Sequence, residues 1–165
     1  MSNATVITAV PDLPFIDIVR EYDAPRELVY RAYSDPELVV QWLGPDRLTV
    51  ELGEYDVRDG GSWSFVHRDT DGTGYGFRGV FHSATPPERI IQTFEFLGAP
   101  GYVSIESVTF EELEGGRTRA VAHAVYPTME ARDAMIENGM EGGVVEGNNR
   151  LDKILARLQE HADSK

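Results

Sequence analysis

The side chains most suited to metal or acid–base chemistry in this sequence are its histidines, and they do not form a cluster. They lie on four separate segments without the short spacing typical of joint metal ligands, so we expect no metal site. They are His67, His82, His123 and His161. His67 stands out because strand alternation places it beside Phe65 and Trp63, where a partly buried imidazole could orient a polar ligand group or titrate near neutrality. A hydrogen-bonded or solvent-reaching histidine is the simpler interpretation.

The common catalytic signatures are also missing from the sequence. There is no cysteine, which excludes a thiol nucleophile and disulfides, and no Gly-x-Ser-x-Gly motif for a serine nucleophile. The glycine-rich stretch 72–76 precedes a predicted strand, so it lacks the helix N-terminus that binds phosphate. We therefore predict no catalytic residue and no cofactor. If the protein were an enzyme, His67 or Glu106 would act as its acid or base.

The composition limits the partners and the location of the chain. With 28 acidic and 15 basic residues the net charge is -13, which repels phosphate backbones, so we expect no nucleic-acid partner. The sequence has neither a membrane-spanning apolar run nor a signal peptide, so we expect no membrane insertion. The absence of cysteine favours a cytoplasmic location. A homodimer remains open. The length of 165 residues fits one domain, predicted at 14–160 with flexible ends at 1–13 and 161–165.

The element that would position any site is a long helical segment at residues 128–159. Its apolar side chains recur at steps of three, four and seven, so they share one face, which needs a sheet to cover. Gly139, Gly143 and Gly147 are four residues apart and share a face as well. The missing side chains allow either close backbone packing or the empty volume of a cavity wall. A further interpretation is a kink after Asn138 with Gly139 as the C-cap.

The chain before this segment reads mostly as strands. A strand at about 15–21 precedes two short helices, at 25–33 and 36–41. Turn residues then separate six further strands, which gives a seven-stranded antiparallel meander in all. The six are predicted at 47–57, 62–68, 75–84, 89–97, 102–113 and 117–126.

Alternation along these strands predicts an aromatic concave surface beneath the long helix. We expect an apolar ligand cavity between the two. Its predicted lining residues are Trp42, Trp63, Phe65, His67, Phe77, Phe81, Phe94, Phe96, Met140, Gly143 and Val144. For the two tryptophans, core packing explains the sequence equally well. On the last strand either face could point inward, and the face that holds Ala122 and Ala124 would leave room under the helix glycines.

Six short motifs, taken in order, give the sequence a family resemblance. They are DAPRELVYRA at 23–32, DPEL at 35–38, QWLGP at 41–45, RDGGSW at 58–63, PER at 87–89 and NGMEGG at 138–143. Over about residues 15 to 158 the chain resembles the heat-shock protein 90 ATPase activator homologue-like family of the START-like, helix-grip (SRPBCC) superfamily. The resemblance implies an α+β helix-grip fold, with a curved antiparallel sheet around a long C-terminal helix, two short helices after the first strand, and a hydrophobic cavity.

The resemblance implies no shared catalytic residues and leaves the ligand open. The superfamily includes lipid, hormone and polyketide binders as well as some cyclases and hydroxylase components. Near the helix glycines, family members often have Glu, bulky or amphipathic residues where this chain has Gly143, Val144 and Val145. We predict that the chain binds a small hydrophobic molecule, lipid-like or polyketide-like. The alternatives are a cavity enzyme of cyclase or hydrolase type and a chaperone-interacting module. We do not expect chaperone interaction, because the additional N-terminal domain of the eukaryotic namesake is not recognisable.

Overall fold

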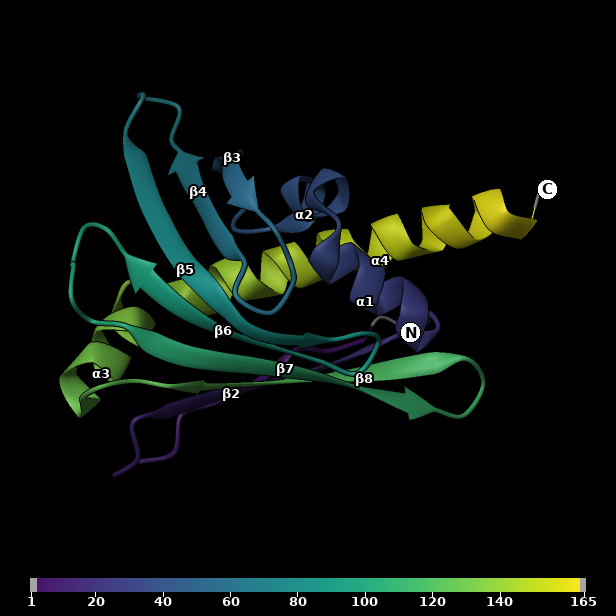
Figure 1. The fold of residues 1–165 in the computed structure, drawn as a ribbon, viewed down its shortest axis with the longest axis horizontal. Coiled ribbons are helices and arrows are strands. Elements are labelled where there is room, and N and C mark those ends of the chain that lie inside the picture. The colour runs from purple at the N-terminus through teal and green to yellow at the C-terminus, as the bar shows by residue number, and fades with distance from the viewer. Residues whose placement is uncertain (1–2, 164–165) are drawn as a thin grey trace.

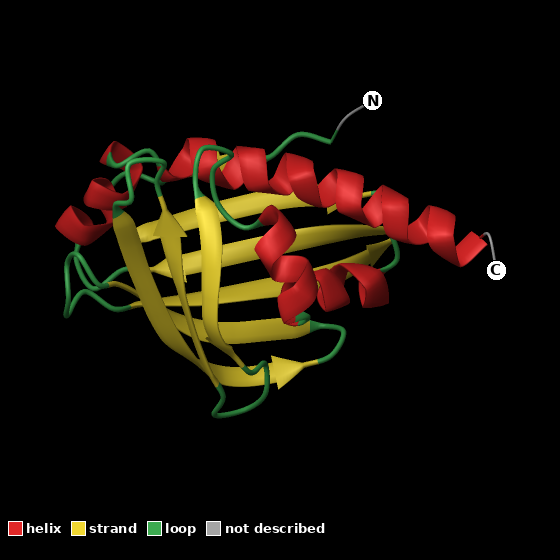
Figure 2. Cartoon of the chain, turned by 90° about the horizontal axis from the view of Figure 1, so that it is seen from above, coloured by secondary structure: helices red, strands yellow, loops and turns green. Residues whose placement is uncertain are grey.

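One curved antiparallel sheet forms the body of the protein, and a long helix crosses its concave side (Figures 1 and 2). The computed structural model describes residues 3–163. The strands run in the order β1-β2-β8-β7-β6-β5-β4-β3. Their bounds are β1 Val6–Thr8, β2 Phe15–Tyr22, β3 Thr49–Tyr55, β4 Ser62–Arg68, β5 Gly74–Thr85, β6 Arg89–Phe96, β7 Ser104–Leu113 and β8 Arg117–Val125. The predicted α+β helix-grip fold is confirmed.

The predicted number of strands is wrong by one, because β1 adds an eighth strand at the edge of the sheet. It pairs with β2 in antiparallel register, with Ile7 opposite Ile18. The segment 1–13, which the sequence analysis expected to be flexible, therefore includes an edge strand. Residues 1, 2, 164 and 165 of the two expected flexible ends lie outside the described residues. A strand of three residues is too short to show a period of two, so only the pairing with β2 reveals it.

Two short helices, α1 (Arg26–Ser34) and α2 (Pro36–Trp42), follow β2 on the concave side of the sheet (Figure 2). Asp35 separates them and caps α2, since its carboxylate accepts a hydrogen bond of 3.0 Å from the backbone N–H of Glu37. The helices are joined in the core by the buried Trp42, whose indole N–H donates to the carbonyl oxygen of Ala32 at 3.0 Å. Of the two roles considered for Trp42, cavity lining and core packing, the structure therefore shows core packing.

The long helical segment is divided into α3 (Met129–Glu137) and α4 (Met140–Asp163). Gly139 lies between them with φ +81°, a left-handed conformation that side chains disfavour, and Asn138 is the C-cap of α3. The predicted kink after Asn138 is thus confirmed, but the C-cap is Asn138 and Gly139 is the residue that follows it. The kink frees α4 to take its own direction across the sheet.

The two halves of α4 differ in how tightly they pack. In the second half, Leu151, Ile154 and Leu155 are buried in the main core cluster. In the first half, Met140 and Val144 are only partly buried and belong to no core cluster. Burial of the second half fixes the helix on the sheet, and it leaves the concave surface near the first half less completely covered.

One guanidinium joins α3 to the hairpin of β1 and β2. Arg132 is buried, and its Nη1 donates to three carbonyl oxygens, those of Val10 at 3.0 Å, Leu13 at 3.1 Å and Phe15 at 3.3 Å. Its Nε donates to Asp133 at 2.8 Å. These charge-assisted bonds satisfy three backbone acceptors that precede or begin β2.

We expect Arg132→Met to destabilise the protein by about 1–3 kcal/mol, because the substitution removes a donor shared by three backbone carbonyls, although that of Val10 keeps a bond of 3.4 Å from the N–H of Leu13. Hydrogen exchange should become faster at residues 10–15 and stay unchanged in β4 and β5. Arg31→Met is the matched helical control, since Arg31 is exposed and makes only a 3.6 Å ion pair with Asp35. Equal stability of the two variants would show that Arg132 does not anchor the hairpin.

Candidate functional site

The concave surface of β4, β5 and β6 is a continuous layer of aromatic rings, as the alternation predicted. Cross-strand pairing places Phe65 opposite Phe77 and Phe77 opposite Phe96. Ring centroids are 5.0 Å apart for Phe65 and Phe77, and 5.4 Å apart for Phe77 and Phe94. Such tilted and stacked contacts order the rings without closing the surface to a further apolar molecule.

Burial divides the predicted lining residues into two groups. Phe81, Trp63 and Phe65 are buried in the core, and the indole N–H of Trp63 already donates to the carbonyl oxygen of Thr93 at 3.2 Å. The lining residues that are only partly buried are Phe77, Phe94, Phe96, Met140, Gly143 and Val144. Solvent still reaches this second group, and apart from Gly143, whose side-chain position faces Pro45, it is where a ligand could make contact.

His67 lies at the end of the aromatic layer, with its ring edge-on to Phe65 at a centroid distance of 4.8 Å. The ring packs on Gly44, whose φ is +86°, so tightly that a side chain at position 44 would overlap it. Its Nδ1 is buried without a hydrogen-bond partner in the described part of the chain. Burial, and then the charge of Arg150, lowers the pKa of His67 to about 4. His67 is therefore neutral at physiological pH, and the expectation that it titrates near neutrality is wrong.

The glycine face of α4 packs closely on the loop that follows α2. A Cβ at Gly147 would lie 2.7 Å from the carbonyl oxygen of Trp42, and one at Gly143 would lie 3.3 Å from Cδ of Pro45. Arg150 fixes this loop, since its guanidinium donates to the carbonyl oxygens of Trp42 and Gly44 and pairs with Asp46. At these two positions the structure has close backbone packing.

The sequence analysis named Glu106 as a candidate acid or base, but it did not predict which residues surround the Glu106 carboxyl group. Glu106 lies on the concave side of β7, with Gln92 of β6 on one side and Ala124 of β8 on the other. Tyr126, just after β8, is buried and interacts electrostatically with Glu106. Burial raises the pKa of Glu106 to about 7 and, together with the Glu106 charge, raises the pKa of Tyr126. The alternation gives the face of each residue, but only the strand register shows that they meet.

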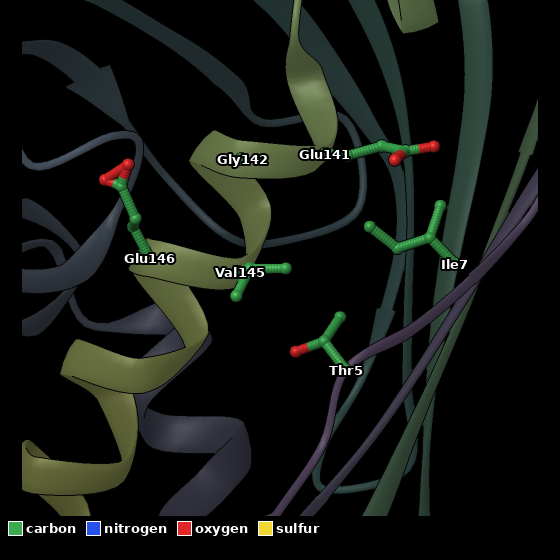
Figure 3. Close-up of a pocket in the computed structure, with 6 residues that line it drawn as sticks. All are labelled: Thr5, Ile7, Glu141, Gly142, Val145 and Glu146. Atoms are coloured by element: carbon green, nitrogen blue, oxygen red, sulfur yellow. The ribbon is translucent and has the colours of Figure 1, made fainter.

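A second feature missed by the sequence analysis is an open groove between β1 and the first turns of α4 (Figure 3). Its volume is about 460 Å³. The groove is lined by Thr5, Ile7, Glu141, Gly142, Val145 and Glu146. Ile7 and Val145 extend into it from opposite sides, while Glu146 turns away and accepts a hydrogen bond from the backbone N–H of Asp46 at 3.1 Å. The sequence analysis did not predict β1, which forms one wall of this groove, and so could not predict the groove.

Two structural features are absent from residues 3–163, a group of metal-binding side chains and a membrane-spanning helix. No group of three or more His, Asp or Glu side chains in that range is arranged to hold a metal ion. None of the helices described there is long and apolar enough to cross a membrane.

Comparison with known proteins identifies one family and many related structures. The family described as "Activator of Hsp90 ATPase homolog 1-like protein" matches residues 23–156. No functionally curated protein matches the chain.

Three similar solved structures have TM-scores between 0.83 and 0.85. A Rhodobacter sphaeroides protein is 25% identical, with a TM-score of 0.85 over 93% of this chain and 99% of its own. An Arthrobacter aurescens protein is also 25% identical, with a TM-score of 0.84 over 92% of this chain and 91% of its own. Protein Ms6760 from Mycobacterium smegmatis is 23% identical, with a TM-score of 0.83 over 92% and 97%. The last of these shows a shared fold only.

Proposed function

Because this chain belongs to the Activator of Hsp90 ATPase homolog 1-like protein family, with its helix-grip fold, we propose that it binds a small apolar molecule between the sheet and α4. The observation that supports this most directly is the incomplete burial of Phe77, Phe94 and Phe96 on the concave surface. A lipid-like or polyketide-like molecule would suit that surface. A cytoplasmic setting, which the absence of cysteine favours, is part of the proposal.

Apolar contact is the main source of affinity in this proposal. Partly exposed rings gain about 25 cal/mol for each Å² of apolar surface that a ligand removes from water. The small side chains of Ala122 and Ala124 lie on the same concave side as Val108 and Glu106, to which they are paired, and both alanines are only partly buried. The site therefore combines aromatic walls with a floor of small residues, which is typical of pockets for apolar ligands.

Glu106 favours a second candidate, an enzyme of cyclase or hydrolase type acting on the bound molecule. A carboxyl group with a pKa near 7 on a ligand-facing surface could transfer a proton at physiological pH. Binding is the first proposal because it needs only the apolar surface. Catalysis needs in addition a substrate atom within hydrogen-bonding reach of the Glu106 carboxyl.

The binding proposal can be tested with a neutral fluorescent probe such as N-phenylnaphthylamine, together with native mass spectrometry of freshly purified protein. We expect the probe to brighten in wild-type protein. Ala122→Leu should weaken probe binding about tenfold or more, because the leucine fills ligand space on the concave side. Val121→Leu, on the opposite face of the same strand, is the matched control and should bind like wild type. Wild-type protein that retains no molecule and binds no apolar probe would contradict the proposal.

A further inference from the structure

Three polar side chains lie together on the concave surface without a hydrogen-bond partner among the described residues. They are Glu106 on β7, Gln92 directly opposite it on β6, and Tyr126 after β8. Among residues 3–163, no hydrogen bond or ion pair reaches the Glu106 carboxylate, the Gln92 amide or the Tyr126 hydroxyl. Glu106 and Gln92 are only partly buried, and none of the three polar groups is enclosed by protein atoms, so a ligand group that enters from the concave side can reach all three.

The neighbours of this polar cluster are apolar or small. Along β7, Glu106 lies between Ser104 and Val108 on the same face, and the Ser104 hydroxyl is directed to the carbonyl oxygen of Phe94 at 3.4 Å. Across the sheet, Ala124 is paired with both Glu106 and Ile16. Beyond Gln92 the same row reaches Phe81. A ligand group that contacts the cluster would therefore have its remaining atoms against apolar side chains.

The chemistry of the three groups indicates which ligand group they would accept. A carboxylate, an amide oxygen and a phenol oxygen are all hydrogen-bond acceptors, and a primary ammonium has three N–H donors. The chain has a net charge of -13, which attracts cations and repels anions. An anionic ligand would bring a second negative charge to an already desolvated carboxyl group.

We propose that the ligand of this site is an apolar molecule with a primary ammonium group, bound jointly by Glu106, Gln92 and Tyr126. This inference rests on the proposed binding function and specifies its ligand class. The ammonium donates to the three oxygens, and the apolar remainder lies against Phe94 and Phe77. Glu106 supplies the opposite charge, while Gln92 and Tyr126 determine the direction of the N–H groups.

The pH dependence of such binding follows from the surroundings of Glu106. Other titratable or charged groups on the elements around the site include Tyr126 after β8, Arg20 on β2, Asp152, Glu141, Glu146 and Arg150 on α4, Arg132 on α3, and His67 on β4. Arg20 is paired with Asp152, and His67 is neutral near pH 7. Burial is the only cause of the raised Glu106 pKa. Since the ammonium pairs with the ionised carboxyl, affinity should rise about tenfold between about pH 6 and about pH 8, with proton release on binding.

The inference can be tested by titration calorimetry at about pH 8 with naphthylmethylamine, naphthylmethanol and naphthoate, which differ in the polar group. In wild-type protein the amine should bind at least about tenfold more tightly than the alcohol, and naphthoate more weakly than either. Glu106→Gln should bind the amine no better than the alcohol. Glu111→Gln, a substitution on the opposite face of the same strand, should keep the wild-type preference. Tyr126→Phe is the second variant and should lose about threefold or more in amine affinity only.

Two results would overturn the inference while leaving the proposed function in place. One is equal binding of amine and alcohol by wild-type protein, and the other is tighter binding of naphthoate. Failure of wild-type protein to bind any of the three probes would overturn both the inference and the proposed function.

Discussion

Gly147→Ala is expected to unfold at a clearly lower temperature than the wild-type protein, while Gly142→Ala unfolds at a higher one. Both residues belong to α4, so an alanine should gain up to about 1 kcal/mol of helix propensity at either position. At Gly147 the new Cβ would lie 2.7 Å from the carbonyl oxygen of Trp42, which Arg150 holds at 2.8 Å. That backbone cannot yield easily, so overpacking should cost about 1–3 kcal/mol or more.

The matched variant removes any explanation based on the helix alone. No described atom outside the neighbouring helix backbone lies within 4 Å of a Cβ built at Gly142. Because the helix-propensity gain is common to both variants, their free energies of unfolding should differ by the overpacking cost alone, about 1–3 kcal/mol or more in urea titrations. Equal stabilities would mean that α4 and the loop after α2 are not in close contact. Gly143→Leu should behave as Gly147→Ala does, because Pro45 occupies the space that the leucine needs.

The wild-type protein is expected to lose about 3 kcal/mol of stability between pH 7.5 and pH 4 through His67 alone. Burial lowers the folded-state pKa of His67 to about 4, whereas an unfolded histidine has a pKa of about 6.5. The unfolded chain therefore binds more protons in this window. The contribution of neutral His67 to the free energy of unfolding is therefore fully present above about pH 6.5. It is lost as the pH decreases toward 4.

Urea titrations at both pH values would measure this loss in wild-type protein, His67→Phe and His82→Phe. Phenylalanine keeps an aromatic ring beside Phe65 but cannot take up a proton, so the stability difference between His67→Phe and wild type should change by about 3 kcal/mol between the two pH values. His82 is exposed, and its replacement should leave the pH dependence unaltered. If His67→Phe and wild type change in parallel, the imidazole is not buried in neutral form.

Much of the secondary structure could be predicted because its signals are local. The two-residue period and the turn residues between strands predicted β3 to β8 to within a few residues. The proline and acidic residues around 35–37 marked the start of α2, and Gly139 marked the break between α3 and α4. β1 was missed because a three-residue edge strand depends on β2 for its existence.

By itself, the sequence determined the family, the helix-grip architecture and the face of the sheet to which each aromatic residue points. Those properties follow from motif order and from the alternation of side chains along a strand. Only the tertiary structure decided which of these aromatic residues remain partly exposed to solvent. The reason is that burial depends on what packs above a strand: Leu151 and Leu155 close one end of the concave surface, whereas Phe77 and Phe94 stay partly exposed.

The polar cluster depends on the tertiary structure in the same way. Glu106 and Gln92 are neighbours only because β6 and β7 pair in one register, and a shift by a single residue would move one of them to the other face. The pKa of Glu106 rises because folding removes water from its carboxyl group, which is a property of the packed chain and not of the residue. The sequence determined that a carboxyl group lies on β7, and the packing of the sheet determined its surroundings.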